Sequence, residues 1–141
     1  MPQIKQNDDS SMGIEGTDAG KGGFVPVSFT YNASSIDAVF FVATRAMIVQ
    51  AITCRPTVAG TDAGAVTAVI KKAASATAIT SGTALHSSTY NLKGTADTIQ
   101  SLTLSTTASD LLIPAGTCIG VDFTGTLTSA TGVITVMLAP A

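Results

Sequence analysis

The sequence has 141 residues, of which 11% are charged and 45% are apolar, and its net charge is −2. Ordinary globular chains carry roughly 25% charged residues, so this chain is unusually poor in charge. It lacks the basic surface that nucleic acids and anionic lipids attract, and we expect neither a nucleic acid nor a membrane as a partner. The length suits a single domain.

The first 24 residues differ from the rest of the chain. They contain all of the net charge, because acidic and basic residues balance over residues 25–141. They show no apolar periodicity, and their glycines would let the backbone follow an irregular surface. We predict an extended N-terminal arm over residues 1–24 and a folded domain over residues 25–141. Ile4, Met12 and Ile14 would be the apolar anchors of the arm; a tail without a partner is the alternative.

The sequence shows no targeting segment. Its first residues lack the apolar core of a secretory signal, and its longest apolar runs are far too short to span a membrane. We therefore expect synthesis in a host cytoplasm.

From Phe24 onward the pattern is typical of β-strands. Residues 25–31 alternate between apolar and other positions, which predicts a strand with one buried face. Pro26 has no N–H to donate, so this strand should begin a sheet or lie at its edge. A short apolar strand is predicted over residues 38–43, and a long strand that is apolar on both faces over residues 46–55.

Turn residues separate the remaining strands. Pro56–Gly64 predicts a turn, and a strand follows over residues 65–72. The weak pattern of residues 73–98 predicts loops with one short strand. A bend is expected over residues 106–116. The last three predicted strands cover residues 99–105, 117–125 and 131–138.

Seven or eight strands with turns between them predict an all-β protein, an antiparallel, jelly-roll-like β-sandwich. Residues 70–79 compete as a helix, but their Ser and Thr content weakens that alternative. Cys54 and Cys118 are expected to be buried thiols in a reducing compartment, with a disulfide between the sheets as the alternative.

The sequence offers little for catalysis. His86, the only histidine, has no acidic residue or cysteine nearby, so we expect it in a loop or on the surface rather than as a base or ligand. The carboxylates of residues 25–141 are spread singly, without the pairing that a glycosidase needs. The acidic stretch 7–16 fails the pattern of a calcium loop. We expect no enzymatic activity, no cofactor and no metal site.

Phe24 and two arginines are further candidates for contact with a partner. Phe24 begins the apolar part of the chain. Arg45 and Arg55 bracket a predicted strand and could bind a partner's carboxylates through two hydrogen bonds each. The competing interpretation of both arginines is strand-end charges that face solvent.

Several stretches resemble the small head-decoration, or cement, proteins of tailed bacteriophages. They are ATR (43–45), RPTVAGTDAGAVTAVIKK (55–72), SGTALHSST with NLKGTADT (81–98), and IPAGTCIGVDFTGTLT (113–128). The resemblance covers about residues 24–141. It implies a β-sandwich, often a jelly roll, that forms an oligomer, often a trimer, on the outer face of an icosahedral capsid.

These observations favour a structural virion protein that binds the major capsid protein and copies of itself on the capsid exterior. It would stabilise the shell at subunit junctions. The candidate contact residues are Ile4, Met12, Ile14, Phe24, Arg45 and Arg55. The alternative is a virion-displayed binding module, such as a fibre head or a carbohydrate-binding domain. The chain has no Trp, and Tyr31 and Tyr90 lie far apart in the sequence, which disfavours an aromatic platform for sugars.

Overall fold

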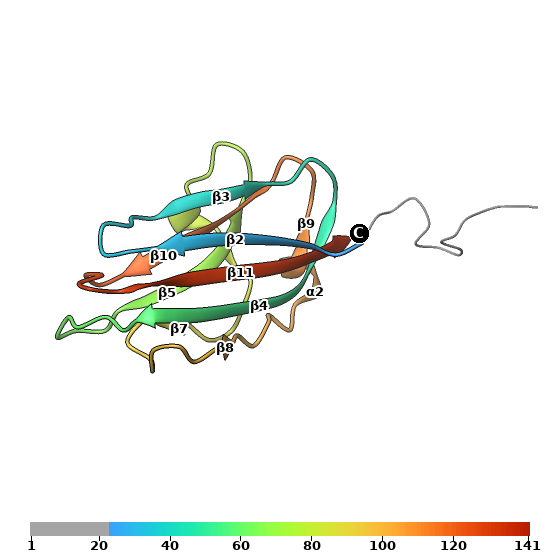
Figure 1. Ribbon diagram of the computed structural model, residues 1–141. Coiled ribbons are helices and arrows are strands. Elements are labelled where there is room, and N and C mark those ends of the chain that lie inside the picture. The colour runs from blue at the N-terminus through green and yellow to red at the C-terminus, as the bar shows by residue number, and fades with distance from the viewer. Residues whose placement is uncertain (1–22) are drawn as a thin grey trace, which may run out of the picture.

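A computed structural model describes residues 23–141, which form a sandwich of two antiparallel β-sheets (Figure 1). The predicted all-β sandwich is therefore confirmed. The strand order of sheet I is β2 (Val25–Tyr31), β11 (Thr131–Pro140), β4 (Met47–Val58) and β8 (Gln100–Ser101), and β9 (Leu112–Ile113) also pairs with β4. The strand order of sheet II is β3 (Ala38–Val42), β10 (Cys118–Thr124), β5 (Thr67–Ala73) and β6 (Thr83–Ala84), and β7 (Tyr90–Asn91) also pairs with β5.

The first four strands alternate between the two sheets: β2 and β4 belong to sheet I, and β3 and β5 belong to sheet II. Two short helical turns join the later strands, η2 (Ile79–Ser81) and α2 (Ala108–Leu111). Residues 70–79 do not form the competing helix, because the first four of them belong to β5.

The end of β4 differs from the prediction. A turn is predicted from Pro56, but β4 continues to Val58. Its pairing with β11 shifts register here, so that Thr131 lies opposite Val58 while Gly132 lies opposite Pro56. Such a β-bulge is one of the few places where a sheet accepts proline, since the ladder is locally interrupted.

The segment predicted as a strand over residues 99–105 changes partners midway. Only Gln100–Ser101 forms a strand, β8, beside β4. The chain then leaves sheet I, and the amide of Ser105 donates to the carbonyl of Leu85 at 3.0 Å. Leu102 and Leu104 still pack against the core. The bend predicted over residues 106–116 contains α2 and β9.

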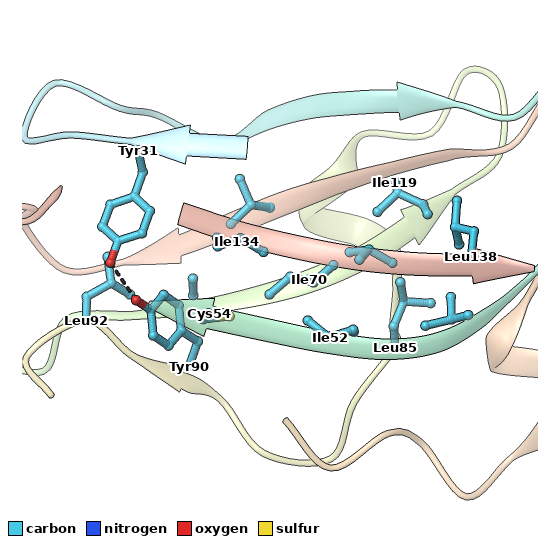
Figure 2. Close-up of a cluster of buried hydrophobic side chains, with 14 of the residues drawn as sticks. Tyr31, Ile52, Cys54, Ile70, Leu85, Tyr90, Leu92, Ile119, Ile134 and Leu138 are labelled. Atoms are coloured by element: carbon cyan, nitrogen blue, oxygen red, sulfur yellow. Dashed lines mark hydrogen bonds between the residues drawn. The ribbon is translucent and has the colours of Figure 1, made fainter. Parts of the chain in front are cut away.

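The core lies between the two sheets, and Figure 2 shows its buried side chains. Sheet I contributes Ile52, Cys54, Ile134, Val136 and Leu138, and sheet II contributes Ala68, Ile70, Ile119 and Val121. These residues alternate with outward-facing ones along each strand, as the period of two in the sequence predicts. Phe123 is partly buried against this core.

The two ends of the described chain lie at the same end of the sandwich. Val25, near the start of β2, is paired with Leu138, near the end of β11, and Figure 1 shows the C-terminus beside the start of β2. β2 is the outermost strand of sheet I, which confirms the edge position predicted from Pro26. The chain therefore enters the sandwich at the start of β2, an edge strand.

Both cysteines are free thiols, so the alternative of a disulfide between the sheets is wrong. Cys54 is buried in the core as predicted, and burial raises the pKa of its thiol to about 12. Cys118, predicted to be buried, is partly exposed because it begins β10, and its Sγ donates to the carbonyl of Ala73 at 3.2 Å.

Candidate interaction surfaces

The structure spreads the predicted contact residues over different parts of the sandwich. Phe24 precedes β2 and is 68% exposed. Arg45 lies after β3 and is exposed. Arg55 lies on the outer face of sheet I, where its guanidinium contacts the carboxylate of Asp97 at 2.8 Å. Ile4, Met12 and Ile14 lie outside the described residues.

His86 lies between β6 and β7, outside the named strands, which agrees with the predicted loop position. It is buried, with only 5% of its surface exposed, so the alternative of a surface position is wrong. Its Nε2 accepts a hydrogen bond from the backbone N–H of Ile70 at 2.9 Å. Its Nδ1 contacts the carbonyl oxygen of Ser88, so the proton of the neutral ring lies on Nδ1. Burial lowers the pKa of His86, and the bond to Ser88 offsets this only in part. A neutral imidazole held at both nitrogens ties the segment between β6 and β7 to strand β5 and has no nitrogen left for chemistry.

Over residues 23–141, no three His, Cys, Asp or Glu side chains come close enough to hold a metal ion. The same residues include no helix long and apolar enough to cross a membrane.

The clearest exposed apolar surface lies along β2 and β3, the outermost strands on one side of the sandwich. The rings of Phe29 and Phe40 close the sandwich there, with centroids 5.6 Å apart. We call this surface the open edge. Its exposed apolar side chains are Phe24, Val25, Ile36, Val39 and Val42. The apolar run of residues 38–43 is visible in the sequence, but its place at an edge depends on the tertiary fold.

A second candidate surface is the outer face of sheet I, which is almost free of charge. Three cross-strand rows of β2, β11 and β4 make up this face. They are Thr30, Val133 and Arg55; Ser28, Thr135 and Thr53; and Pro26, Met137 and Ala51. The hydroxyl groups of Ser28 and Thr135 are hydrogen-bonded at 2.9 Å. A sheet face open to water usually carries more charge, so this composition suits contact with another surface.

A groove of about 220 Å³ crosses this face beside the edge strand β8. Thr53, Arg55, Ile99, Val133 and Thr135 are among the residues that line it. Ile99 is exposed, so the groove has an apolar wall next to the Arg55–Asp97 ion pair. The groove gives the otherwise flat face a recess that a protruding side chain could enter.

The outer face of sheet II, by contrast, is partly covered by the chain itself. Ile79 of η2 packs over Gly120, where an added Cβ would lie 2.7 Å from Cγ1 of Ile79. Lys71 donates to Asp122 at 2.6 Å and to the carbonyl of Thr80 at 2.7 Å. The ammonium group of Lys71 thereby holds the segment around η2 onto the sheet. The two sheets thus differ: within residues 23–141, the outer face of sheet II is partly covered by the chain, and the outer face of sheet I is bare.

Comparison with known proteins gives one likeness of fold. No protein-family model matches the sequence, and the search of the curated proteins gave no match. Among solved structures, the chain is similar to a chain described as the capsid asymmetric unit of cyanophage Pam1, with a TM-score of 0.51 and 14% sequence identity. The alignment covers 96% of this chain and 98% of that chain. At this identity the likeness shows a shared fold, and it extends over nearly the whole of both chains.

Proposed function

We propose that this chain is a structural protein of a bacteriophage virion that binds the outer surface of the capsid and stabilises the shell at subunit junctions. The observation that carries the proposal is the likeness of fold to the cyanophage capsid chain over nearly the full length of both. The resemblance of residues 24–141 to phage decoration proteins points the same way. Part of the proposal is that the chain catalyses no reaction.

The exposed surfaces support this role. The open edge presents five large apolar side chains to solvent. The outer face of sheet I has one charged residue, Arg55, among its nine positions. Burying such surfaces against a shell or against neighbouring copies removes apolar area from water with little cost for desolvating charge. The outer face of sheet I, with its groove, is in our proposal the flank that contacts the capsid.

Binding of this kind stabilises a capsid by linkage. A protein that binds the assembled shell but not its separated subunits favours the shell, by roughly 3–4 kcal/mol per site at several hundred times Kd. Many identical sites multiply the effect. No strained or reactive group is required for this function, only an adhesive surface and a stable fold.

Residues 1–24 have a role in the proposal as an arm that lies across neighbouring subunits, with Ile4, Met12 and Ile14 as anchors. A segment of this length reaches at most about 80 Å. It would leave the sandwich at the start of β2, next to Phe24 and the open edge. An arm at this point could contact a neighbour without crossing the bare face of sheet I.

Self-association completes the proposal. The resemblance implies an oligomer, often a trimer, and we include a homotrimer on that ground. The exterior of the virion is the proposed location. Arg45 and Arg55 lie at different surfaces, so each would contact a different neighbour.

The test uses capsids of the phage that encodes this chain, assembled without it. We expect the full chain to bind these capsids to saturation and to raise their melting temperature. A full-length variant with Ile4→Ser, Met12→Ser and Ile14→Ser should bind more weakly while its own melting temperature is unchanged. Its control carries Gln3→Ser, Gln6→Ser and Ser11→Ala in the same segment. Absence of binding, or binding that leaves capsid stability unchanged while the chain binds cells or glycans, would favour the displayed binding module instead.

A further inference from the structure

The four sheet edges of the sandwich are not equally protected against pairing with another strand. Exposed edges offer unpaired backbone groups, and proteins protect them with short strands, prolines, charges or bulges. On one side of the sandwich the edges consist of β6, β7, β8 and β9, each only two residues long. On the other side, β2 carries Pro26, which cannot donate a hydrogen bond.

The remaining edge strand, β3, is less protected: it is longer than two residues, and the irregularity in it is a register shift in its pairing with β10, between Val39 and Phe41. Its five residues are Ala-Val-Phe-Phe-Val, without a proline or a charge. One side of β3 pairs with β10, and its other side is an edge of sheet II. Val39 and Val42 are 47% and 59% exposed along it, and Ile36 precedes it with a side chain that is exposed as well. An apolar edge strand of this kind is expected to pair with another strand.

We propose that β3 pairs in antiparallel fashion with β3 of a second copy of this chain across a two-fold axis. In such an isologous contact the same patch is used by both copies. The pairing would join sheet II of one copy to sheet II of the other and would cover Val39 and Val42 of both.

Charge complementarity favours a second copy as the occupant and sets the direction of pairing. Asp37 immediately precedes β3, and Arg45 lies shortly after it. Antiparallel pairing brings the acidic end of one strand beside the basic end of the other, whereas parallel pairing would bring like charges together. The carboxylate of Asp37 accepts a hydrogen bond from the N–H of Phe123 at 2.7 Å, which fixes the acidic end against sheet II. The balanced charge of residues 25–141 adds no net repulsion between copies.

This inference goes beyond the proposed function, because it depends on the sheet edges and needs no capsid. A two-fold contact is also separate from the three-fold association that the resemblance implies. It would link two copies, whether or not each also belongs to a trimer.

The test uses two full-length variants, Val39→Lys/Val42→Lys and Val39→Glu/Val42→Glu. Analytical ultracentrifugation should show self-association of the unchanged chain. In each variant, like charges on the two copies face one another across the β3–β3 contact. We therefore expect the dissociation constant for self-association to rise about tenfold or more. Mixing the lysine and glutamate variants should restore association, because opposite charges then face one another.

The matched control is Val58→Lys/Ile99→Lys, which places two lysines at apolar positions of similar exposure away from β3. It should leave the dissociation constant unchanged. Amide hydrogen exchange of residues 38–42 in the unchanged chain gives a second measurement that needs no variant, and protection should increase with protein concentration. A chain that stays monomeric, association that resists the β3 charges, or a mixture that fails to reassociate would each overturn the proposal. Capsid binding is measured separately, so its failure would not be confused with these results.

Discussion

The phenol oxygens of Tyr31 and Tyr90 lie 2.6 Å apart inside the core and join the two sheets through one hydrogen bond (Figure 2). Tyr31 ends β2 in sheet I and Tyr90 begins β7 in sheet II. Both side chains are fully buried, and their rings meet edge to face with centroids 6.0 Å apart. Burial raises the pKa of both hydroxyls, so both stay protonated and one donates to the other.

Removing one of these hydroxyls should cost more stability than removing both. Tyr31→Phe or Tyr90→Phe leaves a buried hydroxyl without its partner, and we expect each to lower the free energy of unfolding by about 1–3 kcal/mol. The measurement is chemical denaturation of the full chain.

The double variant Tyr31→Phe/Tyr90→Phe is the control for this pair. It removes both polar groups and keeps both rings, so its stability should lie closer to that of the unchanged chain than the sum of the single effects predicts. Strictly additive losses would show that the hydroxyls do not act as a pair.

Gly132 makes room for Tyr31, and a larger residue there should destabilise the fold. A Cβ at this position would lie 2.4 Å from the hydroxyl oxygen of Tyr31 and 2.5 Å from the backbone oxygen of Arg55. One of these atoms belongs to the backbone of the neighbouring strand, so we expect Gly132→Ala to cost about 1–3 kcal/mol. Gly64→Ala is the control, because its nearest atom would be 3.7 Å away. Equal melting temperatures for the two variants would contradict this account.

The buried His86 should make stability fall in mildly acidic solution. Burial lowers its pKa in the folded state below the ordinary value of 6.5. Between these two pKa values the unfolded chain binds more protons than the folded chain, so stability increases with pH in this window. The contribution is complete above pH 6.5, is lost as the pH falls toward the lowered pKa, and changes no further below it. Thermal unfolding between about pH 7.5 and pH 5 measures the effect.

His86→Gln isolates this contribution, because glutamine does not titrate. The difference in melting temperature between the unchanged chain and the variant should narrow or reverse as the pH falls. Parallel curves for the two proteins would mean that His86 does not titrate differently in the folded and unfolded states.

The two thiols should differ in reactivity in the folded protein. Burial raises the pKa of Cys54 to about 12, so almost no thiolate is present near pH 8, and the side chain is inaccessible. Cys118 is partly exposed. We expect iodoacetamide to modify Cys54→Ala, which retains Cys118, several-fold faster than Cys118→Ala, which retains Cys54. Both should react at similar rates in denaturant, and rapid labelling of native Cys118→Ala would contradict the buried position of Cys54.

Much of the strand pattern could be predicted because it depends on neighbours along the chain. The alternation in residues 25–31 predicted a strand with one buried face, and Tyr31 is fully buried. Pro26 predicted an edge, since a proline in a central strand would remove a ladder bond. The least regular part, residues 73–116, was also the least well predicted, because its short strands are stabilised by distant partners such as β4 and β5.

The candidate surfaces were harder to predict from the sequence. Arg55 was identified as a contact candidate, but its partner Asp97 lies far along the chain. The sequence did not identify Ile36, Val39 and Val42 as contact candidates. A central strand and an edge strand can have the same apolar sequence, so the sequence does not distinguish them. His86 had no acidic residue or cysteine nearby in the sequence, and its partner Ile70 comes from β5.

The sequence by itself determined that this charge-poor, threonine-rich chain forms β-strands, because side-chain alternation and β-branching act on neighbouring residues. Only the tertiary structure decided that β3 is an apolar edge strand, that no described segment covers the outer face of sheet I, and that Tyr31 meets Tyr90 across 59 residues of chain. Such contacts depend on how strands distant in sequence are ordered within and between the sheets, and that order leaves no periodic trace in any single stretch of residues.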